Sequence, residues 1–329
     1  MTRRAPTRLK CLLIPLPRRP ERMIDMKDCY PTRGGQEATT SPRLDPVAYQ
    51  GWKPYAPITA EQLSHFDEQG FLVLDGLFGD DEIVQMQQAA FALLKDPDGI
   101  DEQTVILEPH DREVRSVFRI HRQCPLMRRL ANDERIAGPI RFLLDDAIYI
   151  HQSRLNFKPG FNGTEFYWHS DFETWHAEDG MPRMRAISAS VLLTENSEQN
   201  GPLLVIPGSH LHFLPGQGET PEDHYRASLR KQEVGTPDTD SITRLVEKGG
   251  LRSIPGKPGQ VILFDCNLMH GSNGNITPFP RSNAFFVYNA ISNRIRQPFS
   301  AQHPRPDFIA ERLIEPVRPV RGSLLAEPA

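Results

Sequence analysis

Apolar and polar residues in the first half of the chain alternate with a helical period. Thr59 and Gln62 have the spacing of a capping box, and Gly70 supplies a stop signal for the helix between them. A later amphipathic stretch carries three acids in its first turn, which suits the helix dipole. The predicted helices cover residues 60–69, 80–96 and 125–144, and the Gly-Pro pair at 138–139 can divide the last of them.

After residue 146 the pattern changes to short apolar runs separated by Gly, Pro and Asn, which is typical of β-strands. Predicted strands cover residues 71–78, 147–158, 185–195, 202–208, 260–265 and 283–291. A polar stretch over 212–250 predicts a long loop with some helix. Helices followed by antiparallel strands indicate a β-sandwich or jelly roll buttressed by helices.

Composition narrows the class of protein. The chain has 329 residues, enough for one large domain or two ordinary ones, and 38% of them are hydrophobic. The net charge of -4 argues against a nucleic-acid binder. No apolar run approaches the roughly 20 residues of a membrane span. The four cysteines are scattered with no C-x-x-C pair, which favours a reducing compartment, and we expect the cytoplasm.

The beginning of the chain is basic and lacks an orderly pattern. Seven Lys and Arg residues stand in the first 25 positions, with no clear apolar stretch or cleavage site for a targeting peptide. We expect residues 1–27 to be a disordered extension or the result of a mis-assigned start, with Met23 or Met26 as the true one. Residues 28–329 are expected to form a single domain.

The candidate chemistry lies on the second half of the chain. His169 and Asp171 are one residue apart, and His270 follows about a hundred residues later at the end of an apolar strand. Two His and one carboxylate are the facial triad of non-haem Fe(II) oxygenases, although zinc is a rival metal. Arg281 begins the next strand and can grip a dicarboxylate cosubstrate through two parallel hydrogen bonds, which zinc hydrolysis would not require.

The strand predicted over 147–158 has one polar face. Alternation places the side chains of Gln152, Arg154, Asn156 and Lys158 on the same side. An isolated strand of this kind would face water. The metal motif eleven residues later favours a polar cavity instead.

Other candidates have simpler interpretations. His151 and His176 are expected to have structural roles or to support the metal ligands, and His210 to be a hydrogen-bonding loop residue. Glu165 and Glu173 could form the carboxylate pair of a glycosidase, but that hypothesis leaves His270 and Arg281 unexplained.

Several motifs carry a family resemblance. The stretches "HSD", "GPLLVIPGSH" and "MHGS" with the downstream Arg resemble the phytanoyl-CoA dioxygenase superfamily. Within it, "FYWHSDFETWHAEDGMPRMRA", "FDCNLMHGSNGN", "DCYPTRG" and "PRLDPVAY" closely resemble the ectoine hydroxylases, over residues 28–296.

The resemblance implies an α+β, mainly β fold with a double-stranded β-helix (jelly-roll, cupin-like) core. It implies Fe(II), with 2-oxoglutarate and O₂ as cosubstrates, the small molecule ectoine as substrate, and a homodimer. The implied iron ligands are His169, Asp171 and His270, and the implied 2-oxoglutarate site is Lys158, Ser188, Ser272 and Arg281. For ectoine the implied residues are Gln152, Thr174, Trp175, Phe264 and Phe285.

The aromatic residues of this set also have a simpler interpretation, because each could be ordinary core. An amidinium ring calls for an aromatic face, and Trp175 follows a predicted metal ligand by four residues, which favours the functional role for it. Phe264 and Phe285 stay open. Three alternatives also remain: the same chemistry on another small zwitterion such as a free amino acid, a non-catalytic solute-binding jelly roll, and a metal-dependent hydrolase.

Overall fold

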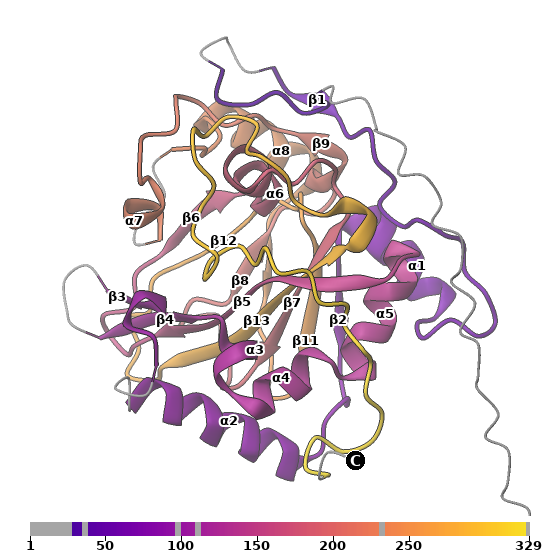
Figure 1. Ribbon diagram of the computed structural model, residues 1–329, viewed down its shortest axis with the longest axis vertical. Helices are drawn as coiled ribbons and strands as arrows, with labels where there is room; N and C mark the ends of the chain where they lie inside the picture. Colours follow the sequence, from indigo (N-terminus) through magenta and orange to yellow (C-terminus); the bar gives the residue numbers. More distant parts are fainter. Residues whose placement is uncertain (1–27, 35–38, 96–99, 109–112, 230–233, 327–329) are drawn as a thin grey trace, which may run out of the picture.

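The computed structural model describes residues 28–34, 39–95, 100–108, 113–229 and 234–326 (Figure 1). The expected N-terminal extension, residues 1–27, lies outside them. The strands are β1 (Ser41–Pro42), β2 (Phe71–Leu74), β3 (Val105–Leu107), β4 (Val114–Phe118), β5 (Ile148–Lys158), β6 (Phe166–His169), β7 (Ala186–Leu192), β8 (Leu203–Val205), β9 (His212–Phe213), β10 (Arg252–Ile254), β11 (Val261–Asp265), β12 (His270–Ser272) and β13 (Arg281–Ala290).

The helices are distributed along the same described ranges. They are α1 (Ala60–Gln69), α2 (Asp80–Lys95), α3 (Ile120–Gln123), α4 (Pro125–Ala131), α5 (Glu134–Leu144), α6 (Asp171–Thr174), α7 (Tyr225–Ser228) and α8 (Thr239–Gly249). Three short 3₁₀ turns, η2 (Glu102–Thr104), η4 (Ser209–Leu211) and η5 (Ile291–Asn293), and one π-helical turn, η3 (Trp175–Asp179), complete the set.

Two antiparallel sheets form the centre of the molecule. Within the described residues, the larger sheet has the order β2-β11-β7-β13-β5-β4-β3 and the smaller one the order β10-β8-β12-β6. A third pair, β1 with β9, joins the N-terminal segment to the body of the fold. Apolar residues of both main sheets, including Phe71, Val205 and Ile262, form one buried cluster between them. The expected jelly-roll core with buttressing helices is confirmed.

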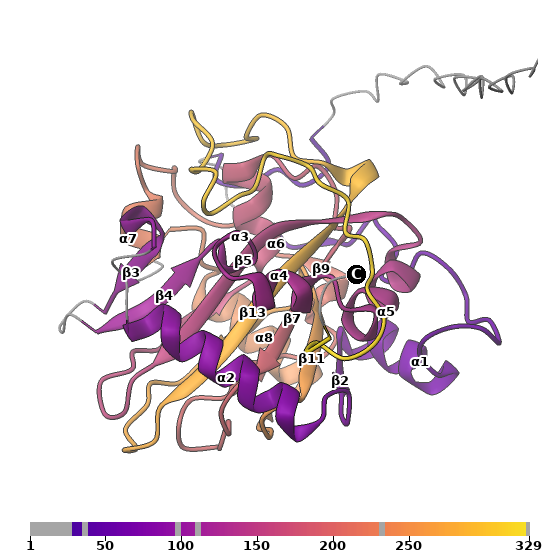
Figure 2. The same ribbon diagram turned by 60° about the horizontal axis from the view of Figure 1, so that its bottom comes forward.

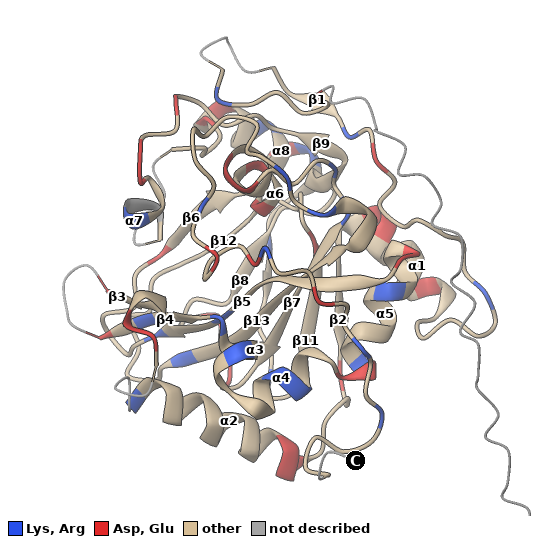
Figure 3. Ribbon diagram, in the orientation of Figure 1, with Lys and Arg blue, Asp and Glu red and all other residues tan. Residues whose placement is uncertain are grey.

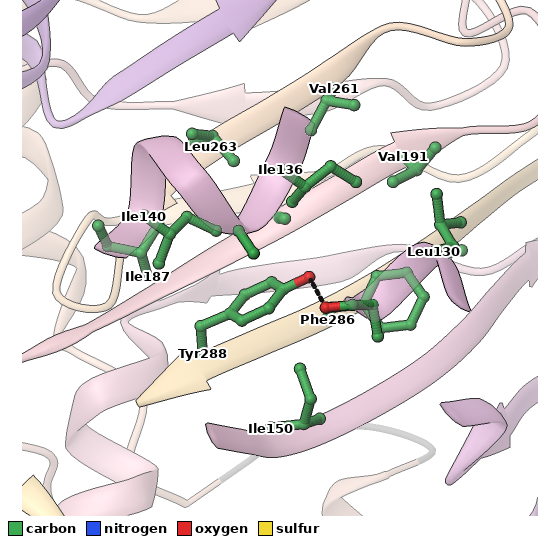
Figure 4. Packing of buried hydrophobic residues seen from close by; sticks show 14 of the residues in the cluster. Leu130, Ile136, Ile140, Ile150, Ile187, Val191, Val261, Leu263, Phe286 and Tyr288 are labelled. Atoms are coloured by element: carbon green, nitrogen blue, oxygen red, sulfur yellow. Dashed lines mark hydrogen bonds between the residues drawn. The ribbon is translucent and has the colours of Figure 1, made fainter. Parts of the chain in front are cut away.

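Helices cover the other face of the larger sheet (Figure 2). Side chains of β7, β11 and β13 point toward α4 and α5, where Ile136 and Ile140 meet Ile187 and Phe286 (Figure 4). The hydroxyl of Tyr288 donates to the Ala131 carbonyl at 2.9 Å, which satisfies its one polar atom inside this core. Because both faces of β13 are covered, all ten of its residues are buried, and the strand is a rigid base for the side chains that it carries.

Most predicted elements are present, and two differ. The helix expected over 125–144 is divided at Asn132 and Asp133 instead of at the Gly-Pro pair, because the Asp133 side chain accepts from the Arg135 backbone N–H and caps a new helix. Pro139 is tolerated inside α5 because the surrounding residues are packed in the core. The strand expected over 71–78 ends at Leu74, because Gly76 turns the chain with a φ of 65°.

The stretch 212–250 holds two helices. The second of them, α8, begins at an Asp238 cap and buries Ile242 and Leu245 against Ile206 and Met269 beside the smaller sheet. The prediction of a loop with some helix is confirmed for the residues described there. In the described part of the chain no helix has both the length and the apolar character needed to cross a membrane.

Candidate metal centre

The three residues of the predicted triad meet at one edge of the smaller sheet. His169 ends β6 and His270 begins β12, and the two residues are direct partners across the antiparallel pair. The chain then leaves β6 through Ser170, whose hydroxyl accepts from the Glu173 backbone N–H and so starts α6 at Asp171 (Figure 1). One strand pair and one helix cap therefore bring all three side chains together.

The donor atoms of the triad converge. The His169 Nε2 lies 3.8 Å from the Asp171 Oδ1, and the His270 Nε2 lies 4.0 Å from the Oδ2. The candidate ligand atoms all lie within 4.8 Å of one another, so one ion can contact all of them. Each Nδ1 donates to a backbone carbonyl two residues earlier, at 2.6 Å for His169 and 2.9 Å for His270. That hydrogen bond leaves the Nε2 lone pair free for a metal.

The protonation state suits coordination. Burial, and then the neighbouring His270, lowers the pKa of His169 to about 4, so its imidazole is neutral near physiological pH. Ser188 donates to the second carboxylate oxygen of Asp171 at 3.3 Å and helps fix its rotamer. Two imidazoles with free Nε2 lone pairs and one hard carboxylate fit the donor set of an Fe(II) facial triad.

A cavity of about 360 Å³ opens directly in front of the triad. His169 and Asp171 form part of its wall, and so do Gln152, Thr174 and Trp175. The remaining wall comes from β4, β5, β6 and the loops around them: Arg115, Ser116, Phe118, Arg154, Glu165, Phe166, Tyr167, Glu178, His224, Leu229, Thr236 and Arg305. The polar face predicted for the strand over 147–158 thus supplies the cavity with Gln152 and Arg154.

The residues expected to bind 2-oxoglutarate lie behind this wall. Lys158 and Arg281 are opposite one another on β5 and β13. The ammonium group of Lys158 donates to the carbonyls of Thr164 and Asn273, and Arg281 donates to the Gly201 carbonyl at 2.6 Å.

Lys158 and Arg281 have few negatively charged neighbours among the described residues. Burial, and then the guanidinium groups of Arg115 and Arg154, lower the pKa of Arg281 to about 9. Burial, and then Arg281, lower the pKa of Lys158 well below its ordinary value. Among the described residues, the Nε atoms of Arg154 and Arg281 are buried without a hydrogen-bond partner. Figure 3 shows basic colour on β4, which carries Arg115, and acidic colour on α6. Such a cluster can accept an anion.

Near the triad and the basic residues lie four other predicted site residues: Ser188, Ser272, Phe264 and Phe285. Ser188 contacts Asp171, and Ser272 pairs with Phe166 across β12 and β6. The Phe264 ring lies against His270, with 5.0 Å between centroids, and the Phe285 ring lies beneath the Arg154 guanidinium. These four residues adjoin the site without forming the wall of the cavity, and the ligand contacts predicted for them remain predictions.

Sequence reasoning missed Arg115 and Arg305 as cavity residues, and it placed Arg154 on the correct strand face without giving it a function. Period-2 alternation from Gln152 was the signal for Arg154. No local pattern marks Arg305, which lies in a Pro-rich loop and forms a buried ion pair with Asp179 at 2.5 Å.

The structure also shows where the other candidate histidines and glutamates lie. His151 contacts Asp179 at 3.1 Å and His176 donates its Nδ1 proton to the Met181 carbonyl at 2.8 Å, consistent with the structural roles expected for them. His210 contacts the Asp67 carbonyl at 3.1 Å from its turn, as expected for a loop residue. Glu173 is fully engaged by Arg33 and is not paired with Glu165, which removes the glycosidase arrangement.

Comparison with known proteins agrees with this site. Residues 66–283 match the family model for phytanoyl-CoA dioxygenase. The chain is 59% identical to the ectoine dioxygenase of Sphingopyxis alaskensis over 287 residues, covering 87% of this chain and 94% of that protein. A crystal structure of EctD from S. alaskensis with 2-oxoglutarate and 5-hydroxyectoine has a TM-score of 0.84 and 54% identity, covering 91% of this chain and 100% of that one. The corresponding structure with bound Fe has a TM-score of 0.83 and 53% identity over the same 91% and 100%.

Residues 66–283 include all three residues of the triad. The protein therefore belongs to the phytanoyl-CoA dioxygenase family, within which its relatives are ectoine dioxygenases.

Proposed function

We propose that this protein is an Fe(II)- and 2-oxoglutarate-dependent dioxygenase that hydroxylates ectoine. Ectoine, 2-oxoglutarate and O₂ are converted to 5-hydroxyectoine, succinate and CO₂. The single observation that carries the proposal is a facial triad beside a cavity lined by aromatic and basic residues, in a chain 54% identical to an EctD whose crystal structure contains 2-oxoglutarate and 5-hydroxyectoine.

His169, Asp171 and His270 would hold the iron. Fe(II), when bound, supplies the activation of O₂ that the hydroxylation needs. The three side chains provide this position without moving, because each Nε2 already faces the carboxylate and each Nδ1 is fixed by a backbone carbonyl.

The basic cluster behind the cavity would bind 2-oxoglutarate. A dianion would give Arg281 and Arg154 the negative partner that the protein itself does not provide. Lys158 would add a further positive group, and the hydroxyl of Ser188, which contacts Asp171, would help to orient the carboxylate nearest the metal. Ser272 lies on β12, the strand that begins with His270, and would contribute its hydroxyl there.

Ectoine would occupy the cavity between the triad and Trp175. Its cationic ring would lie against the indole, with Phe264 and Phe285 behind it. Gln152 donates its amide N–H to the Ile309 carbonyl at 3.1 Å, which leaves its amide oxygen free to accept from the ring N–H groups. Thr174 stands beside Trp175 in the cavity wall and offers a hydroxyl. The protein's main task is to aim one C–H bond at the metal and keep water out.

The proposal extends to the biological setting. A single domain over residues 28–329, a homodimer in the cytoplasm, and a role in protection against osmotic stress are consistent with a small-solute hydroxylase. Among the described cysteines, Cys124 and Cys266 are free thiols, which suits a reducing compartment.

The test compares substrates on one purified sample. With Fe(II), 2-oxoglutarate and O₂ supplied, succinate release is measured with ectoine, with proline as a competing small cyclic zwitterion, and with neither. We expect fast release and 5-hydroxyectoine only with ectoine, because proline lacks the amidinium ring. Coupled turnover of proline with none of ectoine would reject the substrate while keeping the chemistry. Binding of ectoine with no succinate would favour the non-catalytic alternative.

A further inference from the structure

We propose that Arg33 is a positioning residue for the substrate site, and that the two ends of the described chain together fix the π-helical turn η3 that carries Trp175. The inference rests on the proposed function, since it concerns how the pocket for ectoine is held. None of the metal, cosubstrate or substrate residues predicted from sequence lies in either terminal segment, although Arg33 belongs to the motif "DCYPTRG".

Arg33 makes a dense set of contacts to the elements that follow the metal ligands. Its guanidinium donates to both carboxylate oxygens of Glu173, at 2.8 and 2.6 Å, and to Glu178 at 2.6 Å. It also lies 3.5 Å from the hydroxyl of Thr174. The side chains of Arg33, Glu173 and Glu178 are 0%, 2% and 3% exposed. A buried fork of this kind is bidentate and directional, so it fixes the orientation of α6 as well as its charge.

Backbone segments pack closely around the buried ion cluster of Arg33, Glu173 and Glu178. The chain at Gly216 and at Gly235 passes so close to the cluster that a Cβ at either position would collide with Glu173 or Arg33. Thr32 adds a hydrogen bond from its hydroxyl to Glu173 at 2.6 Å and accepts one from the Gly216 N–H at 2.8 Å. Arg33 itself has a φ of 54°, a conformation that a non-glycine residue rarely adopts unless its surroundings enforce it.

The C-terminal segment holds the same turn from another direction. The backbone N–H groups of Ser300 and Ala301 donate to the Ala177 carbonyl, at 3.0 and 2.9 Å, and that of Arg296 donates to the Gly180 carbonyl at 2.9 Å. Phe299 stacks on His176, with 4.0 Å between ring centroids. Figures 1 and 2 show the N-terminal and C-terminal segments running over the end of the molecule that holds α6.

These contacts explain why a π-helical turn persists here. A π-helical turn is rare and is found frequently at functional sites. Its five residues are all buried, and Trp175 is only 2% exposed. The family model covers residues 66–283 and so includes the turn but neither supporting segment. We therefore assign the placement of Trp175 and Thr174 to segments outside the part of the chain that the wider family shares.

Arg33 is the cation that pairs with both Glu173 and Glu178, so its loss should act on the elements that carry these two acids. Arg33→Gln would leave Glu173 and Glu178 buried side by side without their cation. Their repulsion and desolvation would displace the end of α6 and the turn η3, and with them Trp175, while Asp171 at the start of α6 stays held by the hydrogen bond from Ser188. The metal ligand His270 and the 2-oxoglutarate residue Arg281 are on β12 and β13, away from these contacts.

The test compares Arg33→Gln and Arg33→Lys with a matched control. Arg135 also bridges two acids, Glu82 and Asp133, but does so between α2 and α5, at 2.9 and 2.7 Å. We expect Arg33→Gln to raise the KM for ectoine about tenfold or more and to lower the ratio of 5-hydroxyectoine to succinate, with the KM for 2-oxoglutarate within about twofold. Arg33→Lys should be intermediate. Arg135→Gln should lower the Tm and leave the ratio and both KM values unchanged.

A measurement without ligand separates this inference from the proposed function. Hydrogen exchange over residues 171–181 should accelerate in Arg33→Gln and stay at the wild-type rate in Arg135→Gln. If Arg33→Gln does not fold, Thr32→Val replaces it and should show the same changes at smaller size. Unchanged exchange and an unchanged product ratio would overturn the role of Arg33, and so would equal rises in both KM values. A wild type that ignores ectoine would refute the function alone, because the exchange comparison would still decide the role of Arg33.

Discussion

His169 and His270 share one local device that makes them fit to bind a metal. Each donates its Nδ1 proton to the carbonyl of the residue two positions earlier, Tyr167 and Leu268. The backbone before each histidine places that carbonyl within reach, so the tautomer is set by the local backbone and not by the metal. The site is therefore arranged before the ion arrives.

The first prediction at this scale concerns the ion. Replacing His270 by Ala removes one of three ligand atoms that lie within 4.8 Å of one another, so bound iron should fall to the background level after dialysis, and turnover should be lost. The circular dichroism spectrum should stay the same, because the imidazole is at the edge of the cavity and not in the apolar core. Retention of one iron per chain in His270→Ala would contradict the assignment of the triad.

The second concerns the cosubstrate. Arg281→Gln should raise the KM for 2-oxoglutarate roughly tenfold or more, since a charge-assisted hydrogen bond contributes about 1.5–3 kcal/mol. The KM for ectoine should change little. Arg318→Gln, an exposed arginine, is the control. A normal KM in Arg281→Gln would move the anchor to Lys158 or Arg154.

The third concerns the aromatic wall. Trp175→Ala should weaken ectoine binding by roughly 0.5–2 kcal/mol and uncouple the reaction, so that 2-oxoglutarate is consumed with less 5-hydroxyectoine formed. Trp52→Ala, distant in sequence and 45% exposed, should keep the wild-type ratio. An unchanged product ratio in Trp175→Ala would take this residue out of the substrate site.

At the scale of elements, periodic patterns predicted α1, α2, and the strands β2, β5, β7, β11 and β13 of the larger sheet, because burial on one or both faces leaves a regular trace in the sequence. Of the described strands in the smaller sheet they predicted only β8, because β6, β10 and β12 have four residues or fewer. The position of the helix break was wrong. A Gly-Pro pair looked like the stronger breaker, yet the cap formed by Asp133 and the core packing of α5 decided the outcome. Local signals compete, and only tertiary packing settles which one prevails.

The candidate site, like the fold, was predicted only in part. His169 and Asp171 are neighbours in sequence, and His270 follows a strand, so the triad was visible. The support from Arg33 was not, because it joins a short irregular segment to Glu173 across 140 residues. An irregular segment has no period from which its partner can be inferred.

One prediction at the scale of elements concerns Glu82, whose carboxylate pairs with Arg135 and so links α2 to α5. The hydrogen bonds from Arg135 are the largest cause that lowers the pKa of Glu82 to about 2 from an ordinary 4.5. The stabilisation is therefore fully present above about pH 4.5 and is lost as the pH falls toward 2. Glu82→Gln should reduce the free energy of unfolding by about 2–3 kcal/mol at neutral pH.

The measurement is urea unfolding of wild type and Glu82→Gln at pH 7 and at pH 4. The difference between the two proteins should be smaller at pH 4, because the wild-type carboxylate has begun to lose its advantage over the unfolded state. Glu247→Gln, on the exposed face of α8, should match wild type at both pH values. A difference that grows on acidification would contradict the sign of the shift.

At the scale of the whole molecule, one rigid layer carries the chemistry and irregular segments complete it. The larger sheet, packed on both faces, holds Arg281 and Lys158, while the smaller sheet holds the two histidines. The cavity lies where these sheets open and where segments from both ends of the described chain close over α6 (Figure 1). This division lets a common scaffold bind the metal and lets the added segments shape the pocket.

The central claim is that oxygen from O₂ enters ectoine at this site while 2-oxoglutarate is decarboxylated. The most direct test supplies the purified protein with Fe(II), 2-oxoglutarate, ectoine and ¹⁸O₂, and analyses the products by mass spectrometry. We predict equal amounts of succinate and 5-hydroxyectoine, with label in both. Unchanged ectoine, together with 2-oxoglutarate consumed no faster than in its absence, would contradict the account.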